Sequence, residues 1–175
     1  MKELLQTYSK SLVSRRVVLL HLTGVLFIFI PTTFAQAATY YVSTTGSDSN
    51  LGTLTQPWRT VQRAATAMMA GDTTYVRGGT YTENFITFAR SGTSGNVITL
   101  AAYPGETPII DSGLRATSGR RPVFMIAGVN YITLDGLTIQ YGSTANVYIS
   151  YNTPATHITI ENCTMPMVIQ EDNAD

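Results

Sequence analysis

Three acidic residues recur at nearly even spacing in the second half of the sequence. Asp111, Asp135 and Glu161 each follow a short apolar segment, PIID, ITLD and ITIE. If these segments are strands of successive repeats, the carboxylates project one above another at about 4.8 Å, where like charges repel unless a cation relieves them. Calcium prefers carboxylate oxygens, so the spacing predicts a calcium site. The alternative is that these are solvated turn residues, as most surface carboxylates are.

Arginines and tyrosines are the other candidate binding residues. Arg77, in YVRGGTY, and the adjacent Arg120 and Arg121 carry guanidinium forks that match a carboxylate in a bidentate manner. The competing interpretation is local ion pairing and solubility. The tyrosines at positions 103, 141, 148 and 151 offer flat rings for sugars, although stacking between repeats explains them equally well.

Composition excludes several other classes of site. Only His21 and His157 are present, so a histidine-based metal site is excluded. Cys163 is the single cysteine and is interpreted as a small core residue.

From residue 38 onward, the sequence has seven arginines, no lysine and ten carboxylates, which gives a net charge of −3. Without a basic stripe, nucleic acid is not the expected partner.

The first 37 residues differ from the rest. Lys2, Lys10, Arg15 and Arg16 precede the apolar run Val17–Ile30, which is followed by Pro31 and the small-residue stretch AQAA. This pattern predicts a signal peptide cleaved after Ala37, and hence a bacterial protein that is secreted or held at the cell surface. A membrane anchor is the alternative, but a spanning helix needs about 20 apolar residues. No stable span is expected after cleavage.

Residues 38–175 are predicted to be mostly β. A strand at Thr39–Val42 is followed by a helix over Val61–Met69 with one apolar face, for which Gly71 is the expected stop. The chain then changes to short segments rich in β-branched and aromatic residues. These are TTYVR, NFITF, NVITLAAY, PIID, VFMI, YITL, LTI, NVYIS and HITI.

Two of these segments form a repeat. YITLDGLTI, starting at Tyr131, aligns without gaps on HITIENCTM, starting at His157, and a fixed period indicates a solenoid. Gly136 and Asn162 share one repeat position, and both residue types readily adopt the left-handed conformation that a sharp bend needs. We therefore predict an all-β parallel β-helix with three strands per coil and a short N-terminal capping α-helix. A β-sandwich is the alternative.

The N-terminal part also resembles a known group. The segments YYVSTTGSDSNLGTLTQPWRTVQRAATAM, AGDTTYVRGGTYTENF and ITLAAYPGETPIIDSG resemble the opening region of right-handed β-helix proteins of the pectate lyase and chondroitinase B type, including uncharacterised ones, over Thr39 to about Gly113. The resemblance implies a right-handed solenoid and β-elimination on uronate polymers, with calcium neutralising the substrate carboxylate and a neutral Lys or Arg as base. This sequence has no lysine after residue 10 and ends before the catalytic coils of such enzymes, so no catalytic residue is assigned.

The resulting functional hypothesis is an exported, carbohydrate-active β-helix protein, a calcium-dependent lyase of acidic polysaccharides. Residues 38–175 would be its cap and first three to four coils, in a truncated chain. Arg77, Arg120 and Arg121 would bind uronate carboxylates, and Asp111, Asp135 and Glu161 would bind calcium. The alternatives are a non-catalytic glycan-binding or adhesion protein, an inactive fragment, or a hydrolase using two of the three carboxylates. The oligomeric state is not predicted.

Overall fold

The computed structural model describes residues 36–113 and 121–166. Residues 1–35 of the predicted signal peptide, Arg120 and residues 167–175 lie outside these ranges. The elements are β1 (Thr39–Val42), α1 (Val61–Ala67), β2 (Thr73–Val76), β3 (Gly79–Thr82), β4 (Ile98–Ala102), β5 (Pro108–Asp111), β6 (Phe124–Ile126), β7 (Ile132–Asp135), β8 (Thr138–Gln140), β9 (Val147–Ile149) and β10 (Ile158–Glu161).

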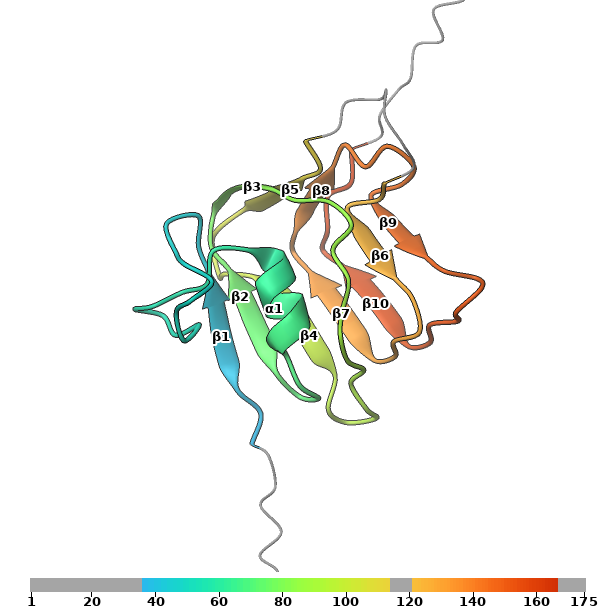
Figure 1. Cartoon of the computed structure of the whole chain (residues 1–175), viewed down its shortest axis with the longest axis horizontal. Coiled ribbons are helices and arrows are strands. Elements are labelled where there is room, and N and C mark those ends of the chain that lie inside the picture. Colours follow the sequence, from blue (N-terminus) through green and yellow to red (C-terminus); the bar gives the residue numbers. More distant parts are fainter. Residues whose placement is uncertain (1–35, 114–120, 167–175) are drawn as a thin grey trace, which may run out of the picture. The chain divides into compact units, whose positions relative to one another are not determined.

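Within the described ranges, the strands pair in parallel and form three sheets; Figure 1 shows their arrangement. Sheet A has the order β1-β2-β4-β7-β10, sheet B has the order β3-β5-β8, and sheet C pairs β6 with β9. Because the chain passes through the sheets in turn, β4-β5-β6 and β7-β8-β9 are two complete coils of a parallel β-helix. The prediction of three strands per coil is confirmed.

The predicted repeat is confirmed in its register. Ile132 pairs with Ile158, and Asp135 pairs with Glu161. The bend after each of these strands has a left-handed residue, Gly136 with φ of 69° and Asn162 with φ of 53°. Gly136 also faces Ala102, whose Cβ would lie 3.1 Å from an added Cβ. Both the backbone conformation and this close approach explain the small residue there.

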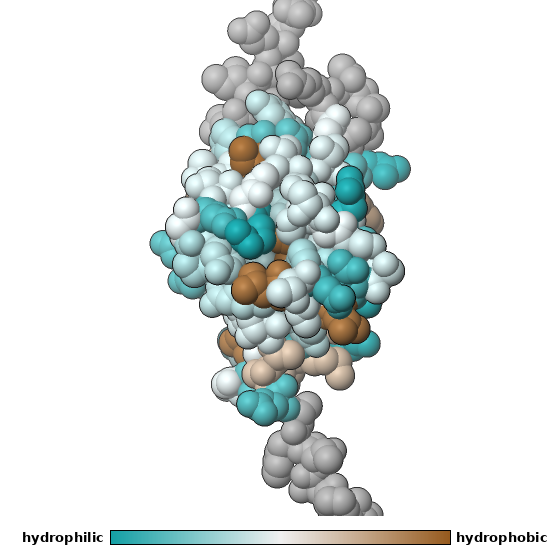
Figure 2. Space-filling view, turned by 90° about the vertical axis from the view of Figure 1, so that its left-hand side faces the viewer, coloured by the Kyte–Doolittle hydropathy of each residue, from teal (hydrophilic) through white to brown (hydrophobic). Residues whose placement is uncertain are grey.

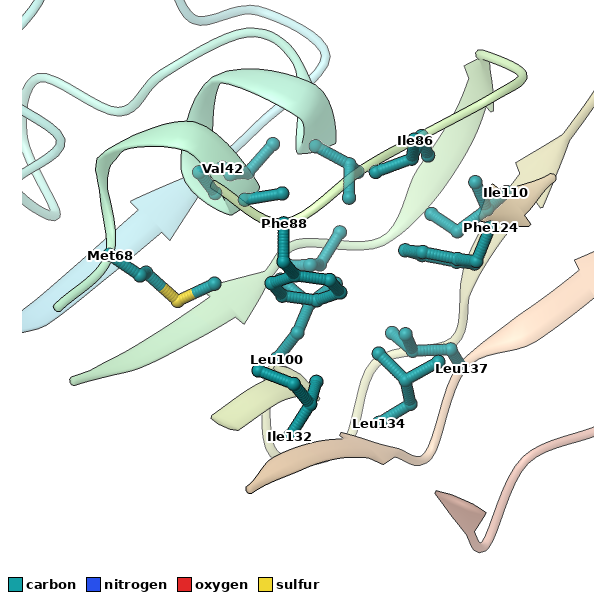
Figure 3. Packing of buried hydrophobic residues seen from close by; sticks show 14 of the residues in the cluster. Val42, Met68, Ile86, Phe88, Leu100, Ile110, Phe124, Ile132, Leu134 and Leu137 are labelled. Carbon is teal, nitrogen blue, oxygen red and sulfur yellow. The ribbon is translucent and has the colours of Figure 1, made fainter. Parts of the chain in front are cut away.

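The bore between the sheets holds the hydrophobic core (Figure 3). Alternate residues of each strand point into it. Leu100 and Leu134 are paired in sheet A and both are fully buried, whereas Ile160, the next residue of the same inward column, is 38% exposed. Cys163 is half-buried and packs against the core, as expected for a small core residue.

Two features cover the N-terminal side of the stack. The outer edge of β1 is bonded by the following loop: Tyr41 N donates to Gly52 O, and Ser43 N donates to Trp58 O. Helix α1 lies beside residues 86–89, since Gln62 bonds both backbone groups of Thr87. Ile86 in turn bridges to β6, so α1 takes the place of a strand in sheet C. The predicted capping helix is confirmed.

The surface near β1 is largely polar, and Figure 2 shows hydrophobic residues there only as separate small areas.

Helix α1 begins at the N-cap Thr60, whose side chain accepts a hydrogen bond from Arg63 N. It ends at Ala67, so the predicted extension to Met69 and the stop at Gly71 are wrong. Met68 already has an extended ψ of 141°, and Gly71, with φ of 92°, belongs to the following turn.

Two strand assignments need correction. NFITF contributes only an isolated bridge, between Ile86 and Phe124, and not a strand. Strand β3 is absent from the prediction because Tyr81 is its only large apolar residue. Within the described residues, no helix has the length and hydropathy needed to cross a membrane.

Candidate functional site

The outer face of sheet A carries two columns of outward-pointing side chains. The first column consists of Tyr41, Tyr75, Ala101, Asp135 and Glu161, and the second of Thr39, Thr73, Thr99, Thr133 and Thr159. Each column receives one residue from each of the five strands, because the ladders are in register. The second column is called the threonine row below.

Asp135 and Glu161 lie next to each other at the C-terminal ends of β7 and β10, as the spacing predicts. Asn162 Nδ2 donates a 2.8 Å hydrogen bond to Oδ1 of Asp135. Glu161 is exposed and Asp135 is partly buried. Two carboxylates on adjacent parallel strands therefore form an acidic pair at one end of the first column.

Asp111 does not belong to this pair, and the prediction of a ladder of three carboxylates is wrong. Asp111 ends β5 in sheet B, between Thr82 of β3 and Gln140 of β8. Gln140 Nε2 and Gly113 N donate hydrogen bonds to its two carboxylate oxygens, at 3.0 and 2.8 Å. The residue that precedes Asp135 in sheet A is Ala101. PIID forms the sheet B strand of its coil, whereas ITLD and ITIE form sheet A strands. The spacing of these segments along the chain does not show which sheet a strand joins.

A calcium cage does not form from these residues. Within residues 36–113 and 121–166, no group of three or more His, Cys, Asp or Glu side chains is placed to hold a metal ion. Calcium takes six to eight oxygen ligands. The Asp135–Glu161 pair supplies carboxylates from two residues only, and one oxygen already accepts a hydrogen bond. These residues therefore do not fit a resident calcium ion.

Arg77 is engaged by Glu106. Its Nε and Nη2 atoms donate to the carboxylate, with Nη2 lying 2.7 Å from Oε1, and Gly78 N also donates to Oε2. Hydrogen bonding with Glu106 raises the pKa of Arg77, and hydrogen bonding with Arg77 lowers the pKa of Glu106. The guanidinium also lies over the ring of Tyr103, at 4.5 Å from its centroid. A ligand carboxylate would have to compete with Glu106.

Arg121 lies in a separate place. It is exposed and precedes β6, and its backbone exchanges hydrogen bonds with Ser143. The structure therefore does not bring Arg77 and Arg121 together in one ladder or contact. Arg120 lies outside the described ranges.

Three tyrosines form a cluster on the outer face of sheet A. The ring centroids of Tyr41, Tyr75 and Tyr103 are 6.0 to 6.2 Å apart, and each ring is partly exposed. Tyr103 is among the candidates predicted from the sequence, whereas Tyr41 and Tyr75 are not. The repeated pattern Thr-x-Tyr at 39–41 and 73–75 is the signal that would have found them. This set is called the tyrosine cluster below.

A small polar pocket of about 200 Å³ lies between the loop after β1 and strand β3, next to the start of α1. Its lining includes Arg59, Thr80, Tyr81 and Glu83. Burial raises the pKa of Tyr81 to about 12. Burial also raises the pKa of Glu83, although hydrogen bonds from Gln62 N and Val61 N counteract it. The Glu83 carboxylate thus holds the helix start and is not free for a ligand.

Comparison with known proteins places this architecture in a family. A family model described as Pel9A-like, right handed beta helix region, matches residues 40–173. The chain belongs to this family of right-handed parallel β-helix proteins, which agrees with the predicted hand and with the resemblance stated from the sequence.

Individual relatives are longer than this chain. Pectate lyase PEL9 of Emericella nidulans is 46% identical over 76 residues, which is 43% of this chain and 18% of the relative. The uncharacterized protein YwoF of Bacillus subtilis is 35% identical over 130 residues, 70% of this chain and 27% of the relative. The chain therefore spans between 18% and 27% of the curated relatives it matches.

Solved structures agree in fold. The crystal structure of pectate lyase Pel9A matches with a TM-score of 0.61 and 23% identity, covering 75% of this chain and 34% of that chain. A rhamnogalacturonan lyase matches with a TM-score of 0.51 and 29% identity, covering 59% and 29%. The fold is thus one that a pectate lyase and a rhamnogalacturonan lyase share.

Proposed function

We propose that the protein is an exported polysaccharide lyase that acts on acidic, uronate-containing glycans with the help of calcium. The observation that carries this proposal is the 46% identity with a relative named as a pectate lyase. The similarity to a rhamnogalacturonan lyase supports the same substrate class. The described coils would serve as the capped scaffold of the lyase.

The chemistry of such a lyase sets out what the described residues supply. In β-elimination, a base removes the proton next to a uronate carboxylate, whose charge is neutralised by a cation. No lysine follows residue 10, and Arg77 is paired with Glu106. We therefore assign neither the base nor the calcium ligands to the described residues. Their proposed role is to hold a glycan and not to cleave it.

A non-catalytic glycan-binding or adhesion protein is the second candidate. The pairing of Arg77 with Glu106 favours it, because Arg77, whose guanidinium lies over the ring of Tyr103, is already paired with a carboxylate of the protein. In this case the protein would bind polysaccharide without releasing product.

A product assay separates these functions. The full chain is incubated with polygalacturonate, alginate and chondroitin, with calcium or with a chelator, and the absorbance of unsaturated uronate is followed. A lyase gives calcium-dependent unsaturated product, whereas hydrolysis gives reducing ends without unsaturation. Retention of the protein on an immobilised glycan without either product supports the binding function and contradicts the lyase.

Export is part of the proposal and needs its own test. The basic N-terminal segment, the apolar run and AQAA support cleavage after Ala37. The mass of the protein recovered from the medium or cell surface is expected to correspond to a chain that starts at Ala38. Recovery of the uncleaved chain from the cell interior would contradict export.

A further inference from the structure

The threonine row presents hydroxyl groups at regular intervals on the outer face of sheet A. Its members pair in register through all five strands, so neighbouring hydroxyls follow the strand spacing of about 4.8 Å. The end residues Thr39 and Thr159 are exposed, and the three between them are partly exposed. Within residues 36–113 and 121–166, none of these five hydroxyls has a hydrogen-bond partner.

The tyrosine cluster lies on the same face. Tyr41 and Tyr75 stand two residues after Thr39 and Thr73 on the same strands, and alternate residues of a strand share a face. Tyrosine rings combine an apolar surface with a hydroxyl, which suits contact with a molecule that has both C–H and O–H groups. A sugar ring has this combination of groups.

The charges of this face select against an acidic ligand. The first column ends in Asp135 and Glu161, and the nearby Arg77 is neutralised by Glu106. An anionic polymer lying across the strands would bring its carboxylates toward this acidic pair, and like charges at short range are unfavourable. A neutral polymer with many hydroxyl groups meets no such penalty.

The length of the face favours a polymer over a single sugar. Four strand intervals separate the ends of the threonine row, about 19 Å in total. This is several times the width of one pyranose ring. An extended chain that crosses the strands could therefore place successive residues over successive coils.

We propose that the outer face of sheet A binds a neutral, extended polysaccharide chain, with sugar rings against the tyrosine cluster and sugar hydroxyls on the threonine row. This site is separate from the proposed cleavage of uronate glycans and does not depend on it. It would hold the protein on a glycan matrix through a component other than the one it cleaves.

Affinity electrophoresis of the full chain tests the proposal, with gels containing β-glucan, galactomannan or polygalacturonate as probes. Three variants alter the site. Tyr75→Ala removes the ring that contacts both Tyr41 and Tyr103. Thr99→Val and Thr133→Val each replace a hydroxyl by a methyl group and keep the β-branched shape. Two matched controls lie on other faces, Phe85→Ala beside sheet C and Thr138→Val on sheet B.

The wild-type protein is expected to be retarded by at least one neutral polymer. Tyr75→Ala should weaken this binding about tenfold, since one aromatic contact is worth roughly the 1.4 kcal/mol that corresponds to tenfold in Kd. Each threonine variant should weaken it about threefold, as for loss of one modest hydrogen bond. Both controls should bind like wild type. Circular dichroism checks that Tyr75→Ala is folded, and the threonine variants carry the test if it is not.

Several results would overturn the proposal. They are no retardation by either neutral polymer, retardation by polygalacturonate alone, or equal effects of the site variants and their controls. The product assay for the lyase is independent of this measurement. Cleavage of uronate glycans without neutral binding rejects only this inference, and neutral binding without cleavage rejects only the lyase.

Discussion

Asn162 donates a hydrogen bond from its side-chain amide to Oδ1 of Asp135 at 2.8 Å, from the bend of one coil to the strand end of the coil before it. Asn162 itself adopts the left-handed backbone conformation of that bend, with φ of 53°. The same residue therefore forms the turn and donates a hydrogen bond to one member of the acidic pair. Glycine, which occupies the equivalent position 136, can form the turn but has no side chain to donate a hydrogen bond.

Substitution of Asn162 separates these two roles. Asn162→Gly keeps the bend and loses an exposed hydrogen bond, so we expect a loss below about 1 kcal/mol in the free energy of unfolding. Asn162→Ala also loses the hydrogen bond and adds the left-handed backbone cost, about 1 kcal/mol more. Urea denaturation measures both. Equal stability of the two variants would contradict the structural assignment of the bend.

Leu134 and Ile160 occupy one inward column but differ in burial, at 0% and 38% exposed. We expect Leu134→Ala to lower the free energy of unfolding by about 2–5 kcal/mol, because it leaves a cavity in the bore. Ile160→Ala should cost clearly less, since its side chain is already partly in solvent. Denaturant unfolding of both variants checks the order. A larger loss for Ile160→Ala would mean that this end of the core is covered in solution.

The hydroxyl of Thr74 is buried without a hydrogen-bond partner, at 0% exposed. Thr74→Val keeps the shape and removes an unsatisfied polar group, so the variant should be more stable by about 1 kcal/mol. Thr73→Val, one residue earlier and on the outer face, is the matched control and should leave stability nearly unchanged. A thermal melt compares them, and a lower Tm for Thr74→Val refutes the prediction.

Glu83 should make a pH-dependent contribution to stability. Burial raises its pKa in the folded protein above the ordinary value near 4.5. The folded state therefore binds the proton more tightly, and this contribution to stability is present below the unfolded pKa and lost as pH rises through the folded pKa. Glu83→Gln should remove this part of the pH dependence. Unfolding midpoints from pH 4 to about 7 test it, and parallel curves for both proteins would contradict it.

The proposed contact between Arg77 and a uronate carboxylate gives a binding prediction. Glu106→Gln removes the charge that holds the guanidinium. We expect stronger retention of this variant on polygalacturonate at low salt, with the gain lost as salt increases. The double variant Arg77→Gln/Glu106→Gln should lose the gain. Unchanged retention of Glu106→Gln would mean that Arg77 has a purely structural role.

Features carried by the repeat were predictable from the sequence. The ungapped alignment of the segments at Tyr131 and His157 gave the pairing of β7 with β10 and the bends at Gly136 and Asn162. Equivalent positions of two aligned repeats lie side by side in neighbouring coils, so the alignment itself gives the register. It also predicts that Asp135 and Glu161 are neighbours.

Features that depend on the path of the chain between sheets were not predictable. Asp111 has the right local pattern but lies in sheet B, because the pattern of a strand ending in an acid occurs in both sheets. The pairing of Arg77 with Glu106 joins residues 29 positions apart through coil geometry alone. The tyrosine cluster was predictable in part: the Thr-x-Tyr pattern marks Tyr41 and Tyr75, but their contact with each other follows from the register of β1 and β2.

The position of α1 gives the stack a direction of growth. The backbone N–H and C=O groups of a helix bond within the helix, so α1 offers no edge with which a further strand of sheet C could pair. The outer edge of β1 is already hydrogen-bonded by the loop containing Trp58. A duplicated gene segment that encodes a coil can therefore be accommodated between existing coils or after β10, but not before β1. Family members are expected to have evolved different lengths by whole coils on that side, with the capping helix as a fixed origin.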